Sequence, residues 1–213
     1  MSAPNPFRAM AGLTKPLEVL LGLGVAMSVV ALWSSFMQAE LLNRGIFDAA
    51  EAESNDAREQ IVGIVQLVLY ALTVVVFGCW IVRANRNVRA SGAMGLRFTP
   101  GWAVGYFFVP ILNLWKPYQA MMDLWRASHD PASWPTAPTS AILPTWWALW
   151  VLSNTLGHAS LRAMLAAEGL KGLQVATYLQ IVSEAVNIPL CLVAIVLATR
   201  IANAQGIHVR TSA

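Results

Sequence analysis

The chain has 213 residues, of which 57% are hydrophobic and 12% are charged, and its formal net charge is +3. This composition is too apolar for an ordinary soluble domain and predicts an all-α integral membrane protein. The basic residues cluster beside apolar runs, where membrane topology explains them, so we expect no nucleic-acid partner. Cys79 and Cys191 both lie inside apolar runs, and we expect packed thiols there rather than a disulfide or a metal pair.

Four apolar runs are long enough to be transmembrane helices, and they cover about residues 17–37, 61–82, 141–164 and 173–202. A helix needs roughly 20 apolar residues to cross a hydrocarbon core of ~30 Å. The first run is too long for the apolar part of a secretory signal peptide, and no small-residue cleavage motif follows it. We therefore expect a single membrane domain over residues 1–213, which begins with a polar lead from Met1 to Lys15.

The segment between the first two runs, residues 40–60, is rich in acidic side chains. It lacks the glycine and the ligand spacing of a calcium loop, so we expect a solvated loop with a helical piece. The second predicted helix then carries Gln66, Tyr70 and Thr73 on one face. These three side chains are expected to form hydrogen bonds to neighbouring helices.

A basic and aromatic block, residues 80–126, follows the second predicted helix. Its apolar run at residues 101–115 contains Pro110, which removes a backbone donor. About 15 residues of helix reach only ~22 Å, which is short for a crossing. We therefore expect four transmembrane helices, together with a re-entrant or interfacial helical segment at about residues 98–128.

The distribution of Lys and Arg supports this arrangement. If residues 101–115 do not cross, ten of these side chains lie on one side of the membrane and four on the other; if they cross, the tally becomes eight and six. Because Lys and Arg accumulate on the cytoplasmic side, the first arrangement agrees better with the sequence. It places the segment at residues 98–128 and both termini on the cytoplasmic side of a bacterial inner membrane.

The basic residues of this block form a first candidate site. Arg83, Arg86 and Arg89 recur every three residues and would extend the second helix as a basic stripe. Such a stripe either binds the phosphate of an anionic lipid headgroup or serves as a topology anchor. Beyond it, Tyr118 and Trp125 recur with helical spacing, which predicts a helix in the membrane interface. The candidate basic site consists of Arg83, Arg86, Arg89, Arg97, Trp102, Lys116 and Arg126.

The same block resembles the signature of a bacterial membrane family. Between Trp80 and Ser128 the chain reads R-A-x-R-N-x-R-A-x-G, L-R-F-T-P-G-W-A-V-G, F-V-P-I-L-N-L-W-K-P-Y-Q-A-M and L-W-R-A-S, in that order. In these residues it is similar to the family called domain of unknown function 4328. The resemblance implies a multi-pass bacterial membrane protein, and it brings no reaction, cofactor or catalytic residue with it.

The fourth predicted helix carries a second candidate site around an intramembrane carboxyl group. Counted from the outer end of that helix, Glu184 lies ~16 Å deep, near the bilayer midplane. A carboxylate at this depth must be paired, protonated or turned towards water. The site is therefore either a proton or cation site or a neutral hydrogen-bonded contact between helices. It consists of Asn154, His158, Gln180, Glu184 and Asn187.

Three functions stay open at this point. The sequence contains no H-E-x-x-H, no G-x-S-x-G and no phosphate-cradling loop, so we expect no catalytic residue, metal or cofactor. The first function is an accessory or interaction protein that contacts membrane lipids, with anionic headgroups, a second copy or another membrane protein as partners. The second is a small ion- or proton-coupled transporter or channel that uses the polar stripe around Glu184. The third is a membrane enzyme that acts on lipid headgroups.

Overall fold

The structure is a computed structural model that describes residues 7–211 of the chain, with side chains placed through Ile207. The predicted cytoplasmic ends at Met1 and Ala213, and the first part of the predicted polar lead, lie outside these residues. Within the described residues every regular element is helical. The all-α class that the composition predicts is therefore confirmed.

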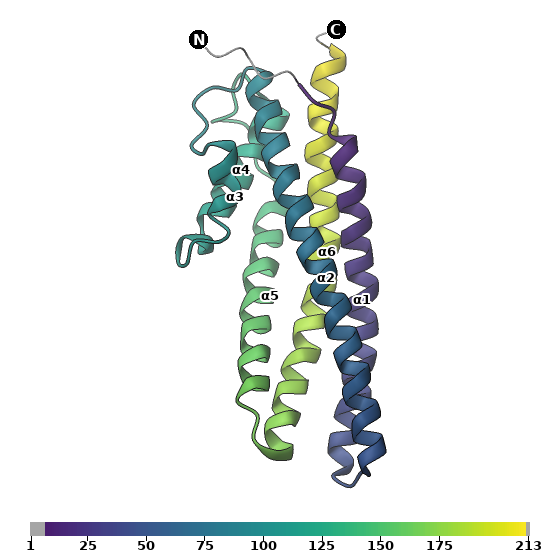
Figure 1. Cartoon of the computed structure of the whole chain (residues 1–213). Coiled ribbons are helices and arrows are strands. Elements are labelled where there is room, and N and C mark those ends of the chain that lie inside the picture. The colour runs from purple at the N-terminus through teal and green to yellow at the C-terminus, as the bar shows by residue number, and fades with distance from the viewer. Residues whose placement is uncertain (1–6, 212–213) are drawn as a thin grey trace. The chain divides into compact units, whose positions relative to one another are not determined.

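Two helical hairpins make up most of the chain. Helix α1 (Ala11–Arg44) is joined by a short turn to α2 (Ala49–Ala90), and α5 (Ile142–Leu165) is joined in the same way to α6 (Gly169–Thr211) (Figure 1). Helices α1, α2 and α6 are long and apolar enough to cross a membrane. Helix α5 has 24 residues, about 36 Å of helix, but among the described residues it contains no 18-residue stretch as apolar as those of the other three helices. Three of the four predicted spans thus correspond to helices that are long and apolar enough to cross.

The long helices extend well beyond the apolar runs that predicted them. Helix α1 ends at Arg44 and α2 begins at Ala49, so the predicted loop at residues 40–60 is largely helical. A reciprocal pair of hydrogen bonds fixes the start of α2. The Asp48 carboxylate accepts from the backbone N–H of Glu51 at 2.8 Å, and the Glu51 carboxylate accepts from the backbone N–H of Asp48 at 3.3 Å. This capping box is a start signal that hydropathy does not detect, and it corrects the predicted loop.

Removal of this cap should loosen the first turn of α2. We expect Asp48→Ala to destabilise that turn by about 1 kcal/mol, because the N–H of Glu51 loses its acceptor. The measurement is amide hydrogen exchange over residues 49–53, which should become faster. The matched control is Asp48→Asn, which removes the charge and keeps a side-chain oxygen for the cap. Equal acceleration in both variants would assign the effect to charge and contradict the capping argument.

Residues 98–128 form short helices rather than one continuous helix. Helix α3 (Pro100–Gly105) is followed by the 3₁₀ turn η1 (Leu112–Leu114) and by α4 (Lys116–His129). Six residues of α3 span ~9 Å, so residues 101–115 make no continuous helical crossing. The chain turns just after Pro110, where Ile111 takes a φ of 67° and a ψ of −53° and the N–H of Leu112 donates to the carbonyl oxygen of Pro110 at 2.8 Å, the geometry of a rare γ-turn. The broken run agrees with the short reach that the sequence indicates.

Helix α4 packs its apolar face against other parts of the protein. Met121, Leu124 and Trp125 on this face are all buried. The sequence predicts a helix in the membrane interface, with its aromatic side chains at headgroup depth. In the structure, the apolar face of α4 is instead covered by its contacts with neighbouring elements of the protein. Periodicity alone does not distinguish a helix that faces lipid from one that faces protein.

The contacts within the chain divide it into two compact units. Unit 1 comprises Met1–Val19, Thr73–Trp147 and Val193–Ala213, and unit 2 comprises Leu20–Leu72 and Ala148–Leu192. Each of the four long helices contributes a segment to both units. In unit 1, α3 and α4 lie against one another (Figure 1), and the core contains Trp80, Leu143, Trp146, Leu197 and Ile201. The division into two units does not test the predicted single membrane domain over residues 1–213, which remains a prediction.

Unit 2 exposes an apolar surface along α2. Ile61, Ile64, Leu67 and Val68 are each more than half exposed, and the most apolar 18-residue stretch of this helix has no buried residue. An exposed apolar surface of this length is unfavourable in water and suits a hydrocarbon environment. The exposed residues of α2 therefore support membrane association independently of the helix lengths.

Candidate functional site

Unit 1 contains a groove of about 600 Å³ beside α2. Its polar lining includes three arginines, Arg8, Arg83 and Arg86, and the amide side chain of Asn87. The apolar lining is larger and comes from α1, α2, α3 and the residues just after α3; its members are Leu13, Val74, Val75, Val82, Val104 and Phe108. The groove therefore combines a cationic region with an apolar wall.

The order of residues on α2 explains why the groove has a cationic region and an apolar wall. Val75, Cys79, Val82 and Arg86 follow one another at spacings of three or four, so they share one face of the helix. The face changes from apolar to cationic at about Val82. Val74 and Arg86, at the two ends of the lining, are separated by ~18 Å along the helix axis.

The arginines of the groove have no acidic partner within the described residues. Neither Arg83 nor Arg86 takes part in the ion pairs of that region. The Nη1 atom of Arg83 lies 3.5 Å from the carbonyl oxygen of Ala9, which is the outer limit of a hydrogen bond. Both guanidinium groups can therefore accept an external anion without first losing a carboxylate.

Asn87 holds the segment before α1 at the edge of the groove. Its Oδ1 atom accepts from the backbone N–H of Arg8 at 3.0 Å, and its Nδ2 atom donates to the carbonyl oxygen of Arg8 at 2.8 Å. Asn87 is 1% exposed, so these bonds form in a site that excludes water. The pair of backbone bonds brings Arg8 next to Arg83 and Arg86. Neither Arg8 nor Asn87 is among the residues that the sequence predicts for the basic site.

Three other members of the predicted basic site are engaged near the start of α3. Arg97 forms two hydrogen bonds with the buried carboxylate of Asp123, one of them at 2.8 Å. Arg89 donates to the carbonyl oxygen of Phe98 at 2.6 Å. The ammonium group of Lys116 lies 5.5 Å from the centroid of the Phe98 ring, within cation–π range. These cations already have partners inside the protein.

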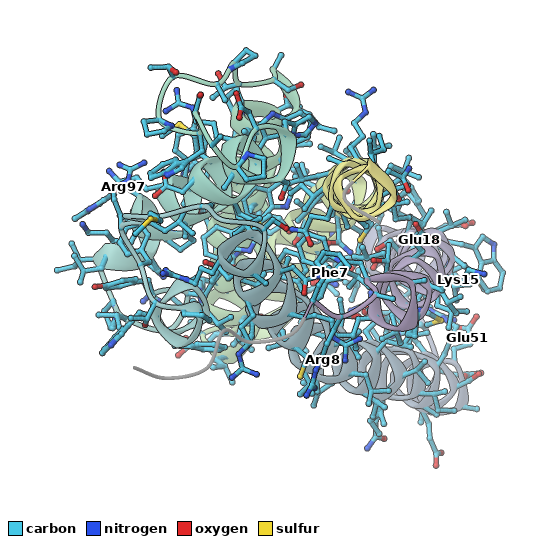
Figure 2. All side chains as sticks on the ribbon, turned by 90° about the horizontal axis from the view of Figure 1, so that it is seen from above. Phe7, Arg8, Lys15, Glu18, Glu51 and Arg97 are labelled. Carbon is cyan, nitrogen blue, oxygen red and sulfur yellow. The ribbon has the colours of Figure 1, made fainter. Side chains whose placement is uncertain are left out.

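The remaining members of that set, Trp102 and Arg126, also lie outside the lining of the groove. Trp102 is exposed and packs against Tyr106, with ring centroids 5.1 Å apart. Arg126 lies 3.5 Å from the carbonyl oxygen of Pro135. Figure 2 shows Arg97 well separated from Arg8. Of the predicted basic set, the structure places Arg83 and Arg86 at the groove and distributes the other five over unit 1.

Unit 2 contains the other candidate site, centred on Glu184 of α6. This residue is 7% exposed. Its Oε1 atom accepts two hydrogen bonds, one from Nε2 of Gln66 on α2 and one from Nε2 of Gln180 on α6, both at 2.9 Å. Its Oε2 atom is buried and has no hydrogen-bond partner among the described residues. The interhelical bond of Gln66 confirms the polar role that its position on α2 predicts.

Further amide and hydroxyl groups of unit 2 surround this carboxyl group. The hydroxyl of Ser28 on α1 faces it and also accepts from Nδ2 of Asn187 at 2.9 Å. On the other side, Ser160 of α5 donates to Oε1 of Gln180 at 2.9 Å. The polar stripe of α6 thus contacts all three other long helices of unit 2, through Ser28, Gln66 and Ser160.

Asn154 and His158 of α5 have other surroundings in the structure. Asn154 donates to the carbonyl oxygen of Trp150, one turn back on its own helix, at 2.8 Å. The side chain of His158 is exposed. Instead, α5 turns Gly157 and Ser160 towards α6. The structure brings together Gln180, Glu184 and Asn187 of the predicted set, and neither Asn154 nor His158 contacts Glu184 among the described interactions.

The chain matches one known family. Comparison with curated proteins and with solved structures finds no match. A family model matches residues 44–203, which include the whole of α2, α3, α4 and α5 and most of α6. This range contains the block from Trp80 to Ser128 whose sequence indicates the resemblance, and the resemblance is thereby confirmed. The chain belongs to the family described as Domain of unknown function (DUF4328).

Proposed function

We propose that the protein is a multi-pass protein of the bacterial cytoplasmic membrane that binds an anionic phospholipid in the groove of unit 1. The observation that carries this proposal is the combination of cationic and apolar lining in one groove, with Arg83 and Arg86 free of acidic partners among the described residues. The protein then acts as a lipid-contacting accessory protein.

The polarity of the groove agrees with the polarity of a phospholipid. The guanidinium groups of Arg83 and Arg86 offer forked donors that match the oxygen atoms of a phosphate. Val75 and Phe108 offer apolar contacts of the kind that an acyl chain makes. The ~18 Å between Val74 and Arg86 accommodates a headgroup and the first part of a chain. A soluble phosphate would use the arginines and leave the apolar wall unoccupied.

A topology with four crossings supports the same conclusion. In this topology α1, α2, α5 and α6 cross the membrane, residues 98–128 stay on the cytoplasmic side, and both termini are cytoplasmic. The tally of ten against four basic side chains favours it. It places Arg83 and Arg86 at the cytoplasmic leaflet, where anionic headgroups attract basic residues.

The test compares lipid binding by the protein in mild detergent. We expect the double variant Arg83→Gln/Arg86→Gln to raise the dissociation constant for phosphatidylglycerol about 10- to 30-fold, because each arginine near a charged surface contributes ~1 kcal/mol. Native mass spectrometry of the protein with added phosphatidylglycerol gives this constant. Binding of zwitterionic phosphatidylcholine should change little.

The matched control for this test is Arg200→Gln, which removes an exposed arginine of α6 in the same unit. Phosphatidylglycerol should bind this variant as tightly as it binds the unaltered protein. Equal weakening by Arg200→Gln would show that net charge rather than the groove attracts the lipid. Parallel loss of phosphatidylcholine and phosphatidylglycerol would also reject a headgroup site.

A second candidate function, a small proton-coupled transporter or channel, is favoured by the buried carboxyl group of Glu184 and its unpartnered Oε2 atom. Its test is proton flux in proteoliposomes under an imposed pH gradient, with Glu184→Gln as the variant.

We propose no reaction on lipid headgroups, because the titratable lining of the groove consists of arginines and Cys79.

A further inference from the structure

The two oxygen atoms of the Glu184 carboxyl group have unequal surroundings. Oε1 accepts two amide N–H groups, from Gln66 and Gln180, each at 2.9 Å. Oε2 accepts none from the described residues, although it is buried. An ionised carboxylate carries half of its charge on each oxygen atom and needs donors at both. Apart from the hydroxyl of Ser28, which can donate to the ionised group, this pattern is unfavourable for a carboxylate.

The same pattern suits a neutral carboxylic acid. In the acid, one oxygen is a carbonyl that accepts two hydrogen bonds, and the other carries the proton. Oε1 has the surroundings of the carbonyl, and Oε2 has those of the hydroxyl. The hydroxyl of Ser28 faces this carboxyl group, and its oxygen retains acceptor capacity beside the bond from Asn187. Ser28 can thus receive a hydrogen bond from a protonated Oε2, and its own hydroxyl can donate to the carboxyl group once the proton has left.

The charges around Glu184 do not compensate an anion. The groups that α1 and α2 present to the carboxyl are Ser28 and Gln66, which are both neutral. On α5 the polar group that reaches this cluster is the hydroxyl of Ser160. On α6 the titratable neighbour is the thiol of Cys191, which has no positive charge to offer. A buried carboxylate without a cation is unfavourable by several kcal/mol, so binding of a proton is the direct way to remove its charge.

A metal ion fits this site less well than a proton. Hard cations take six or more oxygen ligands. Beside the carboxyl oxygen atoms, the described neighbours offer Ser28 as an oxygen ligand, while Gln66 and Gln180 turn their donor nitrogen atoms towards Glu184. The site has two amide donors at one oxygen and a hydroxyl beside the carboxyl group that can accept or donate, which suits the binding and release of one proton.

We propose that the Glu184 carboxyl group of unit 2 is a reversible proton-binding site, with the proton held on Oε2 and released to water as the pH rises. Gln66 and Gln180 hold Oε1 in both states, so gain and loss of the proton change the hydrogen bonding at Oε2 and Ser28. The ligand is a proton, and the proposal is independent of lipid binding in the groove of unit 1.

The first test uses dicyclohexylcarbodiimide, an apolar reagent that reacts with protonated carboxyl groups in apolar surroundings and leaves a stable acylurea. The full chain in detergent should be labelled at Glu184 near neutral pH, as read by mass spectrometry of the peptide that contains it. As the acid ionises with rising pH, labelling should fall about tenfold per pH unit, in proportion to the fraction of protonated acid. Glu51, which is exposed, serves as the internal reference and should stay unlabelled.

The second test detects the proton without any reagent. The infrared spectrum of the unaltered protein should contain a carbonyl stretch of a protonated carboxylic acid, which shifts in D₂O and disappears as the pH rises. Glu184→Gln, which keeps the size of the side chain, should lack this band. Because the titration uses the unaltered protein, it remains informative if the variant does not fold.

Three outcomes would overturn the proposal. The first is the absence of labelling at Glu184 at every pH, together with an infrared spectrum that Glu184→Gln does not change. The second is labelling that does not respond to pH, which indicates a permanently buried acid that only joins helices. The third is protection of Glu184 by Na⁺ or Li⁺ at constant pH, which assigns the site to a metal cation. None of these outcomes bears on phosphatidylglycerol binding by Arg83 and Arg86.

Discussion

Gln205→Glu should lower the free energy of unfolding of unit 1 by about 3 kcal/mol and reduce the apparent melting temperature in detergent by about 5–10 °C. Gln205 lies on α6 and is 2% exposed. Its Nε2 atom donates to the carbonyl oxygen of Ala84 at 3.2 Å and to the hydroxyl of Ser128 at 2.9 Å. Its Oε1 atom accepts from Nδ2 of Asn87 at 3.1 Å. One buried amide therefore joins α2, α4 and α6.

The substitution replaces this amide by a carboxyl group of nearly the same size, so it changes the hydrogen bonding and the charge while the packing stays the same. A carboxylate at this position cannot donate to Ala84, and it faces that carbonyl oxygen with like charge. It would also be a buried charge without a cation, which is a further penalty. Gln205→Leu should show a smaller loss, because it leaves donors and acceptors unsatisfied without adding a charge.

The control for Gln205→Glu is Asn203→Asp, the same change from amide to carboxyl two residues away at an exposed position of α6. This variant should melt within about 1–2 °C of the unaltered protein, because surface substitutions contribute within about 0.5 kcal/mol. Similar melting temperatures for Gln205→Glu and Asn203→Asp would contradict the view that the amide network holds unit 1 together.

The same amide network connects stability with lipid binding. Asn87 donates to Gln205 and also forms both hydrogen bonds to the backbone of Arg8. A change at Gln205 therefore alters the residue that brings Arg8 to the groove. Stability and phosphatidylglycerol affinity should fall together in Gln205→Glu. In Arg83→Gln/Arg86→Gln the affinity should fall while the melting temperature stays nearly constant, because both side chains lack acidic partners.

Hydropathy predicts the existence of the long helices better than their ends. Apolar runs mark the parts of α1, α2 and α6 that suit hydrocarbon, because the length of such a run reflects membrane thickness. The helices continue into polar sequence for other reasons. The start of α2 depends on the reciprocal bonds of Asp48 and Glu51, and the turn before it contains Gly45 at a φ of 69°. Such capping signals are local and are present in the sequence, but they are independent of hydropathy.

The two candidate sites differ in how far spacing along the chain predicts them. Arg83 and Arg86 can be found from spacing because a single helix presents both. The side-chain amide of Asn87 binds the backbone of Arg8 across 79 positions of the chain, and no local pattern contains that information. In unit 2, the spacing of Gln180, Glu184 and Asn187 places them on one face of α6. Helix α5 presents Ser160 rather than His158 to α6, and the four-residue spacing of Asn154 and His158 does not predict this choice of face.

Arg97 is another residue whose partner cannot be predicted from spacing along the chain. From the sequence it is one more cation in a basic block, and an anionic lipid is a natural partner. In the structure its guanidinium forms a forked pair with Asp123, which lies 26 positions later on α4 and whose side chain is 4% exposed. The hydrogen bond to Asp123 raises the pKa of the Arg97 guanidinium. The cation is therefore used to neutralise a buried carboxylate and to fix the segment before α3 onto α4.

Arg97→Leu should consequently destabilise unit 1 by about 2–3 kcal/mol, because it leaves the carboxylate of Asp123 buried without a partner. The double variant Arg97→Leu/Asp123→Leu should recover a large part of this loss, since it removes the orphaned charge as well. Melting temperatures of the two variants in detergent measure the difference. Limited proteolysis between Gly92 and Thr99 should be faster in the single variant than in the double variant.

The sign of the interaction energy decides whether Arg97 serves Asp123 or a lipid. If Arg97 mainly stabilises the buried carboxylate, the double variant is more stable than Arg97→Leu alone and phosphatidylglycerol binds both variants normally. If the two substitutions are additive and phosphatidylglycerol affinity falls about tenfold in Arg97→Leu, the arginine belongs to the lipid site and the ion pair is incidental. Because Asp123 is buried while the Arg97 side chain is 42% exposed, the desolvation of the carboxylate dominates, and we expect the first result.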